Sequence, residues 1–237
     1  MPFLRDLQPE LMDDPALSRT EHQHALVGLS RLNYFSGVIG GMYRQVTRFA
    51  VADRPLKVLD IASGSGDLPV AWAKRARKNG LNLDITATDI SAVAVDEQQQ
   101  RAKSAGVEIH SVQSDCFAEE LPGGFDVVTC SLFMHHLTEQ QSIDLLRAMR
   151  KASDNAVVVC DLDRTRLNYA IVGFASQALT RSHVVHTDAL LSVKNAYTKA
   201  EFAALAQTAF GHSVSVKTMF PSRFLMIDQL DALGNAT

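Results

Sequence analysis

The sequence predicts an α/β fold in which helices cover both faces of a mostly parallel sheet. From Leu56 to Leu162, apolar runs of strand length alternate with amphipathic runs of helix length. Such alternation implies crossover connections, which make consecutive strands parallel. Residues 213–218 and 222–227 instead show strand-like alternation around Pro221, which predicts a closing antiparallel hairpin.

Composition narrows the class of protein. The 23 basic and 26 acidic residues give a net charge of −3, which provides no electrostatic footprint for nucleic acid. Cys116, Cys130 and Cys160 lack the paired spacing of a zinc or redox site, and no secretory leader precedes the fold. We therefore expect a cytoplasmic protein without a membrane span, whose partner is a small molecule.

The first 52 residues precede the first strand and are expected to form a helical extension to a domain at residues 53–237. One helix is predicted to begin at Asp14-Pro15, because proline is tolerated at the first helical position. A second is predicted over residues 36–50. At their junction, Arg31, Asn33 and Tyr34 are candidates for ligand contact or, equally, for helix packing and solvation.

The central stretch is the apolar strand Leu56–Ile61 followed by a turn that contains Gly64 and Gly66. Glycines let the backbone approach a ligand closely with its N–H groups outward, so a nucleotide-like ligand is indicated. Pro69 replaces the third glycine of the dinucleotide fingerprint. The Asp60 carboxylate would repel a diphosphate and suits the ammonium and sulfonium of S-adenosylmethionine, which leaves a dinucleotide oxidoreductase as a distant alternative.

A second strand is predicted to end at Asp89, ahead of a helix capped by Ser91. A carboxylate at this place can accept hydrogen bonds from both ribose hydroxyls of a nucleoside. Asp89 therefore supports an adenosine ligand without choosing between cofactors.

Four motifs resemble, in order and spacing, those of class I S-adenosylmethionine-dependent methyltransferases. They are residues 58–66, 88–90, 114–117 and 125–137. The resemblance implies a Rossmann-like sheet of seven strands, with the N-terminal helices and an insertion at about 164–199 as lids. Ala62 departs from the pattern, because the family carries a glycine there.

The resemblance also implies the residues that contact the cofactor. Asp115 would accept from the adenine amino group, and Cys116 and Phe117 would flank the ring. The full expected set is Asp60, Ala62, Ser63, Gly64, Gly66, Asp67, Asp89, Ile90, Asp115, Cys116, Phe117, Ser131 and His136.

Histidines supply the candidate catalytic groups. His135 and His136 follow the fourth strand, where an imidazole could take a proton from an acceptor hydroxyl or could serve only in packing. His183 and His186 belong to a His-x-x-His-x-Asp pattern that ends at Asp188, in a segment expected to be a polar loop. That pattern allows base catalysis, acceptor binding or, least favoured, a metal.

We expect no metal at the site. Magnesium-dependent catechol methyltransferases carry carboxylates at the end of the fourth strand, where this chain has Cys130 and Ser131. Asp161 and Asp163 alone make a poor site for a hard cation.

A finer resemblance, through residues 9–15 and 179–188, is to bacterial methyltransferases of polyketide and quinone-type metabolism. It favours O-methylation of a small aromatic or polyketide-like acceptor, with Arg31, Asn33, Tyr34 and Phe133 as candidate acceptor contacts. Two alternatives are a C-methyltransferase of a quinol-type ring and a non-catalytic S-adenosylmethionine-binding module. A homodimer is compatible with the sequence.

Overall fold

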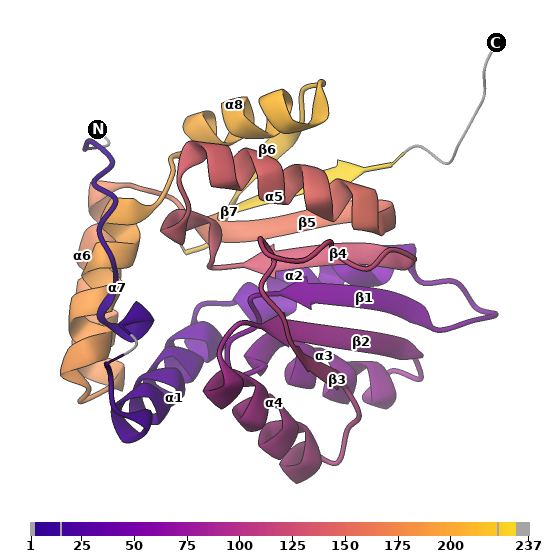
Figure 1. Cartoon of the computed structure of the whole chain (residues 1–237), viewed down its shortest axis with the longest axis horizontal. Coiled ribbons are helices and arrows are strands. Elements are labelled where there is room, and N and C mark those ends of the chain that lie inside the picture. The colour runs from indigo at the N-terminus through magenta and orange to yellow at the C-terminus, as the bar shows by residue number, and fades with distance from the viewer. Residues whose placement is uncertain (1–2, 15, 222, 231–237) are drawn as a thin grey trace.

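A computed structural model of the chain describes residues 3–14, 16–221 and 223–230. One sheet of seven strands forms its centre, in the order β3-β2-β1-β4-β5-β7-β6 (Figure 1). The strands are β1 (Leu56–Ile61), β2 (Leu83–Asp89), β3 (His110–Gln113), β4 (Phe125–Ser131), β5 (Ser153–Leu162), β6 (Ser215–Met219) and β7 (Arg223–Gln229). Strands β1 to β5 pair in parallel, whereas β7 is antiparallel to both β5 and β6. The predicted fold and its closing hairpin are confirmed.

Helices cover both faces of the sheet and one of its ends. α2 (Val38–Val46), α3 (Asp67–Lys78) and α4 (Ala92–Ala105) lie on one face, and α5 (Glu139–Ala152) and α8 (Lys199–Phe210) on the other (Figure 1). α1 (Arg19–Phe35), α6 (Arg166–Leu179) and α7 (His183–Asn195) lie beyond the end of the sheet. There α1 packs against α6 and α7.

The core has two parts because the central strands are buried on both faces. Val58 faces α2 and α3 and packs in one cluster with Met42 and Trp72. The next residue, Leu59, faces α5 and α8 and packs with Leu146 in the other cluster. This alternation follows from the two-residue period of a strand, and it fixes β1 in the middle of the domain.

Local signals place some helix ends correctly and others not. The Thr138–Gln141 and Thr198–Glu201 pairs form the expected capping boxes of α5 and α8. The prediction that the first helix begins at Asp14-Pro15 is wrong: α1 begins at Arg19, after Ser18, whose Oγ accepts from the Glu21 N–H at 3.2 Å. Pro15 itself lies outside the described residues.

The expected polar loop around His183 is also a helix. α7 begins at His183, because the Ser182 side chain caps its first turn by accepting from the Val185 N–H. The described part of the chain also contains three short 3-10 helices: η1 (Leu11–Asp13), η2 (Thr47–Phe49), which follows α2, and η3 (Met134–His136). No helix in the described part of the chain is long and apolar enough to span a bilayer.

Residues 3–13, here called the strap, run along α7 at the end of the sheet (Figure 1). Asn195 exchanges two hydrogen bonds with the backbone of Gln8, at 2.9 and 2.8 Å. The Asp188 carboxylate accepts from the N–H groups of Leu11 and Met12 at 2.8 and 3.0 Å. The third member of the His-x-x-His-x-Asp pattern therefore anchors the strap.

Candidate active site

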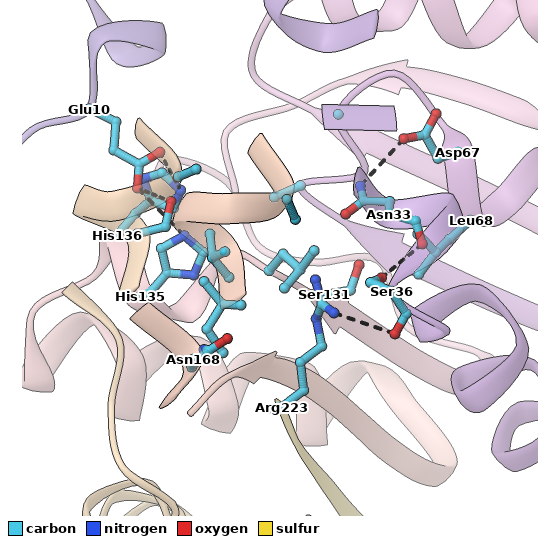
Figure 2. A pocket seen from close by; sticks show the side chains of 18 of the residues that line it. Glu10, Asn33, Ser36, Asp67, Leu68, Ser131, His135, His136, Asn168 and Arg223 are labelled. Carbon is cyan, nitrogen blue, oxygen red and sulfur yellow. Dashed lines mark hydrogen bonds and ion pairs between the residues drawn. The ribbon is translucent and has the colours of Figure 1, made fainter. Parts of the chain in front are cut away.

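A cavity of about 330 Å³ lies where the carboxyl ends of β1, β4 and β5 meet the strap, α1, α6 and α7. Ligands of open α/β sheets bind at this edge. Figure 2 shows Asp67 and Asn33 at one end of the cavity and Glu10, His135 and His136 at the other. One apolar wall comes from α6 and consists of Ile171, Val172, Ala175 and Leu179.

The turn after β1 forms the polar end of the cavity. Its backbone is left-handed at Ala62 (φ 52°), Gly64 (φ 53°) and Gly66 (φ 74°). The alanine thus adopts the conformation that the usual glycine favours, at a cost of about 1–2 kcal/mol. Apart from its two chain neighbours, a Cβ at Gly64 would meet no atom within 4 Å, so the backbone there borders open space, as close approach by a ligand requires.

Asp60 lies beneath this turn and does not line the cavity. Its Oδ1 accepts from Thr129 Oγ1 at 2.5 Å and its Oδ2 from Ser63 Oγ at 2.7 Å, and Ser63 does line the cavity. Burial raises the pKa of the Asp60 carboxyl to about 6, against the lowering effect of these two hydrogen bonds. Asp60 therefore holds the turn, and its charge acts on a ligand only across Ser63.

This burial predicts a pH dependence of stability. Because the pKa of Asp60 is raised from about 3.9 in the unfolded chain to about 6 in the fold, its stabilising contribution is complete below about pH 4 and is lost as the pH rises through about 6. The ligand-free protein should lose about 2 kcal/mol relative to Asp60→Asn between pH 4.5 and pH 8. Urea unfolding of both proteins at the two pH values measures this difference, and an equal difference at both would refute it.

The candidate nucleoside end opens beside the cavity. Asp89 accepts from the Gly64 N–H at 2.8 Å through Oδ2 and from the Ser91 N–H at 2.9 Å through Oδ1. The next residue, Ile90, is 65% exposed and Phe117 is 43% exposed. A backbone hydrogen bond from the Ser114 N–H to the Asp89 oxygen keeps the two loops adjacent. Exposed apolar side chains beside carboxylates suit a flat, polar-edged ring such as adenine.

Asp115 and Cys116 complete this end. Asp115 Oδ1 accepts from the Phe117 N–H at 2.9 Å, an Asx turn that shapes the loop without a ligand. Burial, followed by the charge of Asp115, raises the pKa of the Cys116 thiol to about 11, so the thiol is neutral. The loop thus offers one carboxylate and a neutral, half-buried sulfur.

His135 is the most constrained group at the other end of the cavity. Its Nδ1 lies 2.7 Å from Asp161 Oδ1, and its backbone N–H donates to Asp161 Oδ2 at 3.1 Å. Although burial raises the pKa of Asp161, its interactions with His135 outweigh that effect and hold the pKa below its usual value. An ionised Asp161 fixes the ring and leaves Nε2 toward the cavity, 3.6 Å from Glu10 Oε1.

Glu10 is brought to the cavity by the strap and was not predicted. Its Oε1 accepts from Ser192 Oγ at 2.6 Å, and its Oε2 lies 3.9 Å from His136 Nε2. Glu10, His135 and His136 place one ligand atom each within 4.8 Å of one another, a spacing that a metal ion could bridge. The only sequence signal was the acidic residue in the motif at residues 9–15, to which no role could be given.

The structure brings some of the predicted site residues together and separates others. Asn33, Ala62, Ser63, Gly64, Asp67, Ser131, His135 and His136 line the cavity. The other predicted residues do not line it: Asp60, Gly66, Phe133, Asp89, Ile90, Asp115, Cys116, Phe117, Arg31, Tyr34, His183 and His186. His186 Nε2 lies 2.9 Å from the Thr180 oxygen, and His183 and Arg31 border a separate shallow surface pocket.

Comparison with known proteins agrees with this geometry. Residues 58–154 match a family described as a methyltransferase domain. The ubiquinone biosynthesis O-methyltransferase of Pseudomonas aeruginosa is 36% identical over 89 residues, 37% of this chain and 36% of that protein. The ubiquinone/menaquinone biosynthesis C-methyltransferase of Paraburkholderia phymatum is 36% identical over 110 residues, 44% and 43% of the two chains.

A solved structure extends the likeness to the whole fold. Magnesium protoporphyrin IX methyltransferase from Synechocystis, with S-adenosylmethionine bound, aligns over 93% of this chain and 88% of its own at 14% identity and a TM-score of 0.56. Residues 58–154 are therefore a methyltransferase domain, in the fold of the class I S-adenosylmethionine-dependent methyltransferases. The chain spans less than half the length of the two curated relatives.

Proposed function

We propose that the protein transfers a methyl group from S-adenosylmethionine to an oxygen atom of a small, largely apolar acceptor. The observation that carries this proposal is a histidine, His135, oriented by Asp161 so that its Nε2 lies at the acceptor end of the cavity. When bound, the cofactor supplies an electrophilic methyl group on a sulfonium. The open, left-handed turn at residues 62–66 and the carboxylate of Asp89 are the groups expected to hold it.

In this mechanism His135 Nε2 accepts the proton of the acceptor hydroxyl while that oxygen attacks the methyl carbon. A bound S-adenosylmethionine would supply that carbon and would leave as S-adenosylhomocysteine, with the bonding electron pair on its sulfur. Asp161 stabilises the imidazolium that forms, and Glu10 faces its new N–H. Holding the two reactants in line is worth more, roughly 7–11 kcal/mol, than the base itself.

The lining of the cavity supports an apolar acceptor. Ile171, Val172, Ala175 and Leu179 present one face of α6 to it. Asn168, at the start of the same helix, is buried and lines the floor, with its Nδ2 donating to the Asp163 oxygen at 3.0 Å. A planar ring with one hydroxyl, such as a phenol or pyrone, satisfies this combination.

The test is transfer of a labelled methyl group to a panel of phenols, pyrones and quinols, with products resolved by mass spectrometry. A labelled ether supports the proposal. A labelled carbon–carbon bond would instead favour ring C-methylation, the alternative supported by the likeness to a quinone C-methyltransferase. Binding of S-adenosylhomocysteine with no transfer to any acceptor would favour a non-catalytic binding module.

Asp89→Ala is expected to weaken binding of S-adenosylhomocysteine more than tenfold, because a carboxylate that accepts from two ribose hydroxyls would be lost. Asp89 also holds Gly64, so loss of loop shape must be separated from loss of ribose contact. Isothermal titration with a 2′,3′-dideoxy analogue does this: the variant and the wild type should bind it almost equally. Unchanged affinity for S-adenosylhomocysteine itself would contradict the assignment of Asp89 to the ribose.

Three expectations from the sequence stay predictions. Absence of a metal is checked by metal analysis of the purified protein and by adding a chelator to the methyl-transfer assay, since Glu10, His135 and His136 have a metal-compatible spacing. A homodimer is checked by light scattering in solution. A cytoplasmic location is checked by fractionation of cells.

A further inference from the structure

Arg223 is a buried cation on the floor of the cavity. It begins β7, pairs with Leu162 of β5 and is 7% exposed. Figure 2 shows its side chain rising into the cavity beside Ser131 and Ser36. Its Nη1 reaches the Ser36 oxygen at 3.5 Å, and within the described part of the chain its Nε has no hydrogen-bond partner.

The carboxylates around the cavity have other partners. Asp67 is held by Arg101 Nη1 at 2.5 Å, and Asp161 by His135 at 2.7 Å. Glu10 lies against His135 and His136 at the far end. Among residues 3–14, 16–221 and 223–230, no carboxylate lies within ion-pair distance of Arg223.

A buried charge without a partner is costly, and native proteins pair such groups. A guanidinium with an open edge matches a carboxylate, which can accept two parallel N–H bonds from it. The methyl-donor class carries no phosphate, so the anion expected in this cavity is a carboxylate. Burial lowers the pKa of Arg223 and outweighs the raising effect of Cys160 and Asp161, and a bound anion would offset that cost.

We propose that Arg223 is a carboxylate-binding residue of this cavity, pairing with an acid group of a ligand. The inference rests on the proposed function for its choice of ligands. Two ligands could supply the group: the methionine end of the cofactor or an acidic acceptor. The nearness of Arg223 to Ser131, at the end of β4, and to Ser36 places it between the two ends of the cavity.

Calorimetric titration of Arg223→Gln distinguishes the two sources. S-adenosylhomocysteine carries the carboxylate, and 5′-methylthioadenosine lacks the whole amino acid. If the cofactor supplies the group, the variant should bind the first at least tenfold more weakly than the wild type and the second equally well. If the acceptor supplies it, binding of salicylate to protein saturated with S-adenosylhomocysteine should fall at least tenfold, and binding of phenol should not.

Arg223→Lys is the matched control, because it keeps the positive charge but loses the two parallel N–H donors of the guanidinium. It should show a smaller loss on the same ligand, and it carries the test if the glutamine variant does not fold by circular dichroism. Unchanged binding of both S-adenosylhomocysteine and salicylate in a folded variant would overturn the inference. Failure of the wild type to bind S-adenosylhomocysteine would refute the proposed function instead, and the salicylate comparison, made without cofactor, would then decide the role of Arg223.

Discussion

His135→Ala is expected to lower kcat by about 10²–10⁴-fold, the usual contribution of a general base. Affinity for S-adenosylhomocysteine should be nearly unchanged, because His135 lies at the opposite end of the cavity from Asp67, the residue that follows the turn at residues 62–66. Single-turnover transfer of labelled methyl gives the first quantity and titration calorimetry gives the second. The decrease in kcat should be smaller at high pH, where more of the acceptor hydroxyl is ionised without the help of a base.

Two controls separate catalysis from packing. His183→Ala removes an exposed histidine that does not line the cavity, and it should leave turnover unchanged. Asp161→Asn should lower kcat by less than His135→Ala and shift the pH profile, because the imidazole remains but loses its anionic partner. If His135→Ala folds normally and turns over at the wild-type rate, no base is needed, and C-methylation of an activated ring becomes the better interpretation.

Trp72→Ala should destabilise the fold by about 3–5 kcal/mol, the range for removing a fully buried aromatic side chain. Trp72 on α3 is 0% exposed, and its Nε1 donates to the Ile39 oxygen of α2 at 2.9 Å. It therefore joins the N-terminal helices to the sheet. Since this is the single tryptophan of the sequence, urea unfolding should be followed by far-ultraviolet circular dichroism rather than by fluorescence.

Trp72→Phe is the matched control. It keeps most of the packing and loses the hydrogen bond, whose net value is about 0.5–1.5 kcal/mol, so the loss should be well below that of the alanine variant. A loss under 1 kcal/mol for Trp72→Ala would show that α2 is not held to the sheet through this contact.

Much of the fold was predictable because its signals are local. β1 is a short, mostly apolar run in which every residue except Lys57 is buried, and its bounds are those expected from the sequence. Thr138 and Thr198 start α5 and α8 through side chains that act within four residues. The first helix was misplaced because Asp14-Pro15 and Ser18 are competing start signals only four residues apart.

The candidate site was less predictable because its acceptor end is assembled from distant parts of the chain. Glu10 lies in a segment whose apolar residues show neither helical nor strand periodicity. Its position at the cavity depends on its contacts with Ser192 and His135, which are distant in the sequence. The sequence shows Arg223 only as a polar residue at a strand end, and its burial beside Ser36, in the link between α1 and α2, depends on a distant part of the chain. His183 and His186 on α7 do not line the cavity, and their spacing in the sequence cannot show which side of a helix meets it.

The strap imposes an order on biosynthesis. Its backbone bonds to Asp188 and Asn195 close over 177 and 187 positions of the chain, so the ribosome makes the strap long before the surface on which the strap docks. A nascent chain that already holds β1 to β4 still lacks α7, the helix on which the strap and Glu10 dock. Because contacts between distant residues form late, we expect the protein to bind its nucleoside part before it can enclose an acceptor.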